Sequence, residues 1–260
     1  MQESTHQDPW PLIRQQAKTI LEQEPALSPL MLSAIINRHS LVSALAHRLA
    51  HRLAAPDLPA TPLLALFDEA LVKAPDISQS IHCDMHAIVS RDAAVGQLID
   101  VLLYMKGFHA LTTHRLAHLL WKNGRKHMAR YIQSRASEVF QTDIHPAAVI
   151  GDGIFIDHAT GVVIGETSVI GNNVTLLHDV TLGGTGKTAG LRHPCVEDGV
   201  LVGAGAQVLG RITIGRNARV GAGAVVLHSV DPGMTVAGIP ARPVGDIQHP
   251  HRTELPQCGR

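Results

Sequence analysis

The sequence predicts an α+β protein in which an all-helical N-terminal domain precedes a left-handed parallel β-helix with one protruding loop. One observation is the distribution of glycine: of 23 glycines, 18 lie between residues 144 and 240, and only three precede residue 144. The other is a six-residue repeat of aliphatic side chains over the same stretch. We therefore expect a helical domain over residues 1–140, a β-helix over 141–245 and a flexible C-terminal tail over 246–260.

The N-terminal half contains segments with the apolar spacing of amphipathic helices. Residues 40–53 place leucines and alanine on one face, with Ser40 as the predicted N-cap. Residues 108–124 repeat this spacing and end at an Asn-Gly pair, which is a common helix stop. We expect six to eight helices of this kind, packed as a bundle.

A further helix is predicted over residues 61–75. Thr61 is its predicted cap, Pro62 suits the first helical position, and Pro75 is the predicted stop.

The C-terminal half is a repeat with a period of six, which matches neither an α-helix nor an ordinary strand. Each hexad is expected to form a short strand and a turn, and three hexads form one triangular coil of about 18 residues. The aliphatic side chain points into the core, and glycine or asparagine occupies the tight turns. The predicted core positions are Ile144, Ile150, Ile156, Val162, Ile164, Ile170, Leu176, Leu182, Val196, Val202, Val208, Ile214, Val220 and Val226.

The repeat is interrupted between Leu182 and Val196 by "TLGGTGKTAGLRHP" (181–194). This stretch resembles a phosphate-binding P-loop, but the glycine that such a loop requires five positions before Gly186 is replaced by Thr181. No helical pattern follows it either. We interpret it as a surface excursion from the β-helix, a place where solenoid proteins often build their sites.

Bulk composition excludes several classes of function. Lys+Arg and Asp+Glu both number 22, so no basic surface for nucleic acid or for an acidic membrane is indicated. No run of 18 apolar residues predicts a membrane span, and the polar N-terminus lacks the apolar core of a signal peptide. Three widely spaced cysteines favour a reducing compartment over a disulfide framework. We expect a cytoplasmic protein.

Histidine is abundant, with 17 residues, but we expect no metal site. The helical pairs His47/His51 and His114/His118 are interpreted as surface or interface histidines, because a metal would need a further ligand. A β-helix with histidines also fits the zinc-binding γ-class carbonic anhydrases. The Arg-His-Pro loop and the helical domain argue against that alternative. Cys195 is not expected to act as a nucleophile.

Three segments of the second half resemble those of the hexapeptide-repeat acyltransferases and, within them, of the bacterial serine acetyltransferases. They are residues 140–167, 180–194 and 235–242; residues 91–111 of the helical half are similar too. The resemblance implies transfer of an acetyl group from acetyl-CoA to the hydroxyl of L-serine, giving O-acetylserine and CoA, the first step of cysteine biosynthesis from serine. It implies no permanently bound cofactor, with acetyl-CoA as co-substrate.

The resemblance also implies roles for single residues. An alcohol needs a base to attack a thioester, and His158 is the expected general base, oriented by Asp143. Arg192 and His193 are expected to bind the serine carboxylate, and Asp92 and Asp157 its ammonium group. The residues expected along CoA are Gly184, Thr185, Lys187, Ala204, Gly205, Ala222 and Arg242.

The resemblance further implies a homo-oligomer, a trimer or a dimer of trimers joined by the helical domain, with cysteine as feedback inhibitor. Relatives bind O-acetylserine sulfhydrylase through a C-terminal isoleucine; this chain ends in Arg260, so we do not expect that complex. Two alternatives remain at this point. One is a related acyltransferase acting on a sugar or xenobiotic hydroxyl, and the other is a non-catalytic scaffold that retains the coil.

Overall fold

The computed structural model describes residues 8–187 and 189–246. Within them the chain forms two compact units, one up to Met105 and one from Lys106 onward. The predicted boundary at residue 140 is where helix gives way to strand, whereas packing divides the chain at residue 105. The predicted tail over residues 246–260 lies outside the described residues, apart from its first residue.

The first unit is helical. Its helices are α1 (Trp10–Gln23), α2 (Ser28–Met31), α3 (Leu41–Leu53), α4 (Ala60–Lys73), α5 (Pro75–Arg91) and α6 (Leu98–Tyr104), with a 3-10 turn at Pro25–Leu27 and a π turn at Leu32–Ile36. Ser40 caps α3 as predicted, because its hydroxyl accepts a hydrogen bond from the Ser43 N–H at 3.2 Å. No described helix is long and apolar enough to cross a membrane.

The predicted start of α4 was wrong. The helix begins at Ala60 after an extended Pro59, so Thr61 lies inside the first turn rather than at the cap. Its predicted stop is confirmed: the helix ends at Lys73, and Ala74 has a non-helical φ of −137° and ψ of 75°, as is usual for the residue before a proline. Pro75 itself begins α5, where its missing N–H costs no hydrogen bond.

The second unit starts with an antiparallel helix pair, α7 (Lys106–Lys122) and α8 (Lys126–Phe140). The predicted stop of α7 at Asn123-Gly124 is confirmed, and Gly124 has the expected left-handed φ of 77°. Both helices contact the first coil of the strands that follow, α7 against β1 and β3 and α8 against β1.

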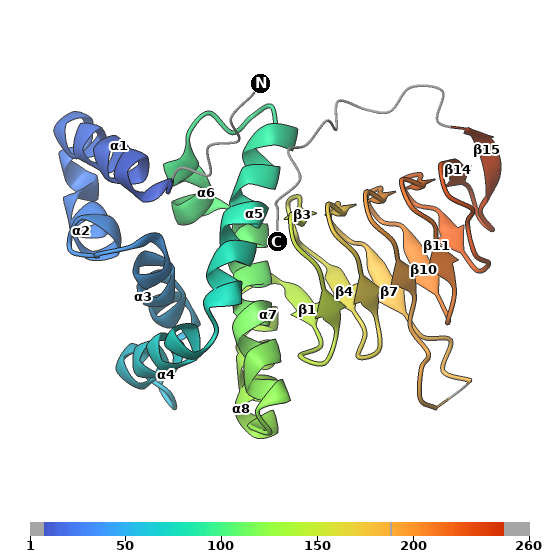
Figure 1. Cartoon of the computed structure of the whole chain (residues 1–260), viewed down its shortest axis with the longest axis horizontal. Helices are drawn as coiled ribbons and strands as arrows, with labels where there is room; N and C mark the ends of the chain where they lie inside the picture. Colours follow the sequence, from blue (N-terminus) through green and yellow to red (C-terminus); the bar gives the residue numbers. More distant parts are fainter. Residues whose placement is uncertain (1–7, 188, 247–260) are drawn as a thin grey trace. The chain divides into compact units, whose positions relative to one another are not determined.

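A parallel β-helix follows, with three faces along its length (Figure 1). The first face has the order β1-β4-β7-β10-β13, the second β11-β8-β5-β2 and the third β15-β14-β12-β9-β6-β3. All pairs are parallel except β14–β15. The strands are β1 (Thr142–Ile144), β2 (Val149–Ile150), β3 (Phe155–Ile156), β4 (Val162–Ile164), β5 (Val169–Ile170), β6 (Thr175–Leu176), β7 (Thr181–Gly183), β8 (Cys195–Val196), β9 (Leu201–Val202), β10 (Gln207–Leu209), β11 (Thr213–Ile214), β12 (Arg219–Val220), β13 (Val225–Val226), β14 (Met234–Ala237) and β15 (Arg242–Asp246).

The hexad positions form the core of this β-helix, as predicted. Thirteen of the fourteen predicted aliphatic residues are buried in one continuous cluster, and Ile150 packs against it half-buried. Register confirms the stacking: Ile144, Ile164 and Leu182 are direct neighbours on adjacent strands. The predicted fold class, a helical region followed by a hexapeptide β-helix with an excursion after β7, is therefore confirmed.

Histidines gather where α7 packs on the first coil. His114 is buried, and its pKa lies well below the usual 6.5, first because of burial and then because of the charges of His118 and Arg115. Burial also lowers the pKa of His118, whose Nδ1 donates to the Pro146 carbonyl at 2.8 Å, and that of His145. Burial therefore favours the neutral form of these imidazoles.

Acid should weaken this packing. Unfolded histidine takes up a proton near pH 6.5 and folded His114 does not, so the unfolded state binds more protons as pH falls below about 6.5. We expect unfolding free energy to decrease through that range, by up to about 1.4 kcal/mol per pH unit from His114. Thermal unfolding between pH 7.5 and 5 measures this. His114→Gln should flatten the dependence, while His228→Gln at an exposed position should leave it unchanged; equal slopes in all three proteins would refute the assignment.

Candidate active site at two corners of the β-helix

His158 lies in the turn between β3 and β4. Its side chain is 72% exposed, and its Nε2 lies 3.7 Å from Oδ2 of Asp157. The ring stacks edge-on against His178 of the next coil, with 5.6 Å between ring centroids. An exposed imidazole beside a carboxylate is able to accept a proton from a bound alcohol.

The turn at His158 is the first of a column of turns at the same corner of successive coils. The Asp179 N–H donates to the Thr160 carbonyl at 2.7 Å, the Gly205 N–H to His178 at 3.0 Å and the Gly223 N–H to Ala204 at 2.8 Å. The predicted CoA residues Ala204, Gly205 and Ala222 therefore continue the corner that His158 begins. These three residues have small side chains.

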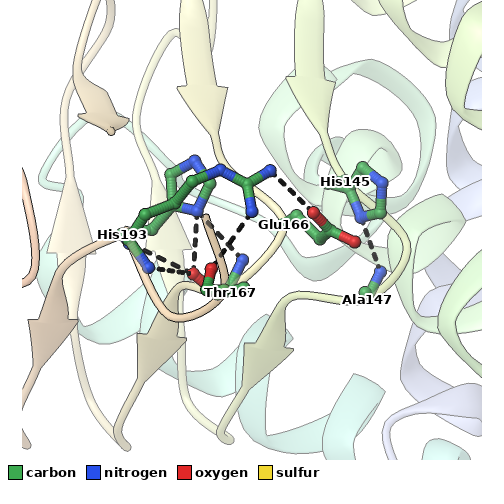
Figure 2. Close-up of polar contacts among 7 residues, drawn as sticks. His145, Ala147, Glu166, Thr167 and His193 are labelled. Atoms are coloured by element: carbon green, nitrogen blue, oxygen red, sulfur yellow. Dashed lines mark hydrogen bonds and ion pairs between the residues drawn. The ribbon is translucent and has the colours of Figure 1, made fainter. Parts of the chain in front are cut away.

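A second corner is built around Thr167, which follows β4. Its hydroxyl oxygen accepts the backbone N–H groups of Arg192 at 3.0 Å and His193 at 3.1 Å, so it holds the end of the excursion (Figure 2). The Thr167 N–H in turn donates to Nδ1 of His193 at 3.1 Å, and the Thr167 hydroxyl lies 2.9 Å from the same atom. The sequence resemblance did not single out Thr167.

This contact decides which nitrogen of His193 carries the proton. Nδ1 accepts a hydrogen bond from a backbone N–H, so the proton of the neutral ring sits on Nε2. Burial and the charge of Arg192 lower the pKa of His193 and favour that neutral form. The ring is thus set to donate through Nε2. It packs on Gly165, where an added Cβ would lie 2.0 Å from the ring carbon Cδ2.

Arg192 is held by Glu166, the residue before Thr167. A guanidinium N–H donates to Oε2 of Glu166 at 2.7 Å, and this hydrogen bond lowers the pKa of the carboxyl. A second N–H donates to the Gly190 carbonyl at 3.1 Å. His145 lies close by and accepts the Ala147 N–H on Nδ1 at 3.0 Å (Figure 2). This corner therefore holds a guanidinium paired with Glu166 and, beside it, a buried imidazole, which are groups of the kind that bind a carboxylate.

The two corners lie at opposite ends of β4 within one chain. His158 precedes the strand and Glu166–Thr167 follow it, and three strand residues span about 10 Å. Among the described residues, no hydrogen bond or ion pair joins Asp143 to His158, the predicted pair. Asp143 instead accepts from Nε2 of Gln133 at 2.7 Å. The role of Asp143 stays a prediction.

The remaining predicted residues are more scattered. Asp92 caps the C-terminus of α5 in the first unit and accepts the Ala94 N–H at 2.8 Å; its part in the site stays a prediction. Gly184, Thr185 and Lys187 lie on the excursion after β7, and Thr185 and Lys187 are exposed there. Arg242 is exposed at the start of β15. No group of three potential metal ligands occurs in the part of the chain that the structure describes.

Comparison with known proteins identifies the family. The family "Serine acetyltransferase, N-terminal" matches residues 10–113, and the bacterial transferase hexapeptide family matches residues 196–228. Serine acetyltransferase of Escherichia coli K12 is 48% identical over 236 residues, covering 91% of this chain and 86% of that protein. The chain belongs to the serine acetyltransferase family. The family member from Haemophilus influenzae is 49% identical, covering 90% of this chain and 88% of its own.

Solved serine acetyltransferases have the same fold. The Brucella abortus enzyme in complex with coenzyme A is 50% identical with a TM-score of 0.90, over 91% of this chain and 95% of that one. The soybean enzyme complexed with serine is 49% identical with a TM-score of 0.89, over 90% of this chain and 97% of that one. A serine acetyltransferase in complex with cysteine is also 49% identical with a TM-score of 0.89, over 91% of this chain and 98% of that one. The predicted enzyme class, an acetyl-CoA-dependent serine acetyltransferase, is confirmed at the level of the family.

Proposed function

We propose that this chain acetylates L-serine with His158 as the general base. The imidazole takes the proton of the serine hydroxyl as its oxygen attacks the thioester carbonyl of acetyl-CoA. The C–S bond then breaks, the acetyl group stays on oxygen, and the departing sulfur takes the proton back from the imidazolium. O-acetylserine and CoA are the products. The observation that supports this role is the exposed histidine at the head of the column of turns.

Arg192 and His193 are proposed to bind the serine carboxylate. Glu166 and Thr167 fix both groups, so little side-chain freedom is lost when the ligand binds. Asp157 beside His158 and Asp92 are proposed for the ammonium group. A base near the hydroxyl and a cation for the carboxylate would hold serine at both ends.

CoA is proposed to lie along the column of turns, from His158 towards Ala204, Gly205 and Ala222. Backbone groups and small side chains would contact the pantetheine arm. Gly184 and Thr185 of the excursion would approach it, and the cations of Lys187 and Arg242 would meet phosphates. The CoA complex of the Brucella abortus relative supports a CoA site in this fold.

A complete site would need two chains. His158 and the Arg192–His193 corner lie at opposite ends of β4, whereas a serine molecule is only a few ångströms long. In a homotrimer, the His158 corner of one chain would face the second corner of its neighbour. Three outward-facing valines would be covered in such a contact: Val149, Val163 and Val169, whose exposed fractions lie between 36% and 51%.

Pairing of trimers through the helical unit, and inhibition by cysteine at the serine site, are proposed from the family alone.

The test measures CoA thiol release from acetyl-CoA with different acceptors. L-serine should support release. Ethanolamine, which has the hydroxyl and ammonium but no carboxylate, should be slower by about 10²-fold, since a charge-assisted bidentate contact is lost. Arg192→Ala should lose most of that preference. Faster thiol release with sugars or carboxylate-free alcohols than with serine would refute the substrate assignment. If the folded protein released no CoA thiol with any acceptor, the assignment as an enzyme would be refuted.

A further inference from the structure

The turn that holds His158 has an unusual backbone. His158 and Ala159 are successive non-glycine residues with left-handed φ angles of 56° and 63°. Side chains with a Cβ rarely adopt this region, and alanine has no polar group to stabilise it locally. The Thr160 N–H donates back to the His158 carbonyl at 2.8 Å, which makes the turn tight. Surrounding structure has to hold such a turn in place.

The start of α7 lies directly against the strand that leads into this turn. A Cβ added at Gly107 would lie 1.9 Å from the carbonyl oxygen of Ile156 and 3.0 Å from its carbonyl carbon. Both atoms belong to the backbone, so neither can move aside as a flexible side chain would. Ile156 is two residues before His158. The helix therefore fixes the entry to the turn by backbone contact.

The neighbouring residue, Lys106, contacts the exit of the same turn. Its Nζ donates a hydrogen bond to Oγ1 of Thr160, two residues after His158. Lys106 is the first residue of α7, where a positive charge opposes the helix dipole. Helix formation thus gives no reason for a lysine here, whereas the contact with Thr160 does.

We propose that Lys106 and Gly107 are positioning residues for the general base. Gly107 packs against the strand before His158, and Lys106 holds Thr160, two residues after it, so α7 keeps the imidazole at the head of the CoA column. This inference rests on the proposed function, because it assigns the two residues to the work of His158. Neither residue is proposed to touch substrate.

Lys106→Met tests the proposal, because it keeps the aliphatic stem and removes the donor. We expect kcat to decrease on the order of ten- to a hundredfold, as for a base misplaced by about 1 Å, with KM for serine and acetyl-CoA within about twofold. Lys106→Arg, which keeps a donor, should recover most of the rate. Lys122→Met, at the exposed far end of the same helix, is the matched control and should behave as the wild type.

A double-mutant cycle separates positioning from a general loss of structure. In a His158→Asn background, Lys106→Met should cause no further decrease, since the group that it positions is gone. An equal decrease in both backgrounds, or a kcat for Lys106→Met within twofold of Lys122→Met, would overturn the proposal. Gly107→Ala should likewise lower kcat in the wild-type background only. A His158→Asn protein as active as the wild type would instead refute the general base itself.

Discussion

Replacing His158 with asparagine should lower kcat/KM for serine by about 10²–10⁴-fold, the usual contribution of a positioned general base. Asparagine is the suitable replacement because it accepts left-handed φ angles, and His158 has a φ of 56°. Alanine would add the cost of a strained backbone to the loss of the base. Thiol release at saturating acetyl-CoA measures the effect.

Two observations should accompany that loss. Thermal unfolding and CoA affinity should stay close to wild type, because the side chain is 72% exposed and contributes little packing. His228→Asn, at an exposed position elsewhere on the β-helix, should keep full activity. If His158→Asn retains more than about a tenth of the activity, another residue must be the base.

Adding a methyl group at Gly165 should cost both stability and serine affinity. The new Cβ would lie 2.0 Å from Cδ2 and 2.1 Å from Nε2 of His193, so the ring has to leave its place. Overpacking of this kind usually costs about 1–3 kcal/mol. Because the displaced ring would no longer donate from its fixed position, we expect kcat/KM for serine to fall by about 10²-fold, chiefly through KM.

The His193→Ala background isolates the cause. Without the ring, the added methyl group meets no obstacle from residue 193, so Gly165→Ala should cost little further stability there. Thermal unfolding of the four proteins in this cycle gives the coupling free energy directly. A loss of stability that is the same in both backgrounds would show that the methyl group acts on the coil and not on His193.

The sequence alone determined most of the fold. Each hexad places one aliphatic side chain inward, and a narrow coil has room for little else, so the period predicts core positions such as Ile164 and Leu182 directly. Local chemistry also identified the Ser40 cap and the Asn123-Gly124 stop, because those signals act within a few residues. It also predicted the end of α4 before Pro75, but it put the cap of that helix at Thr61, whereas the helix already begins at Ala60.

Only the tertiary structure decided how the site is supported. Thr167 and Gly165 contact His193 across more than 25 residues, and Lys106 contacts Thr160 across 54, so no local pattern marks them. The structure also placed His158 and Arg192 at different corners of the β-helix. Residue type is enough to suggest a base or a carboxylate-binding cation. Which residues hold them, and which tautomer results, depends on contacts between coils that exist only after the chain has folded.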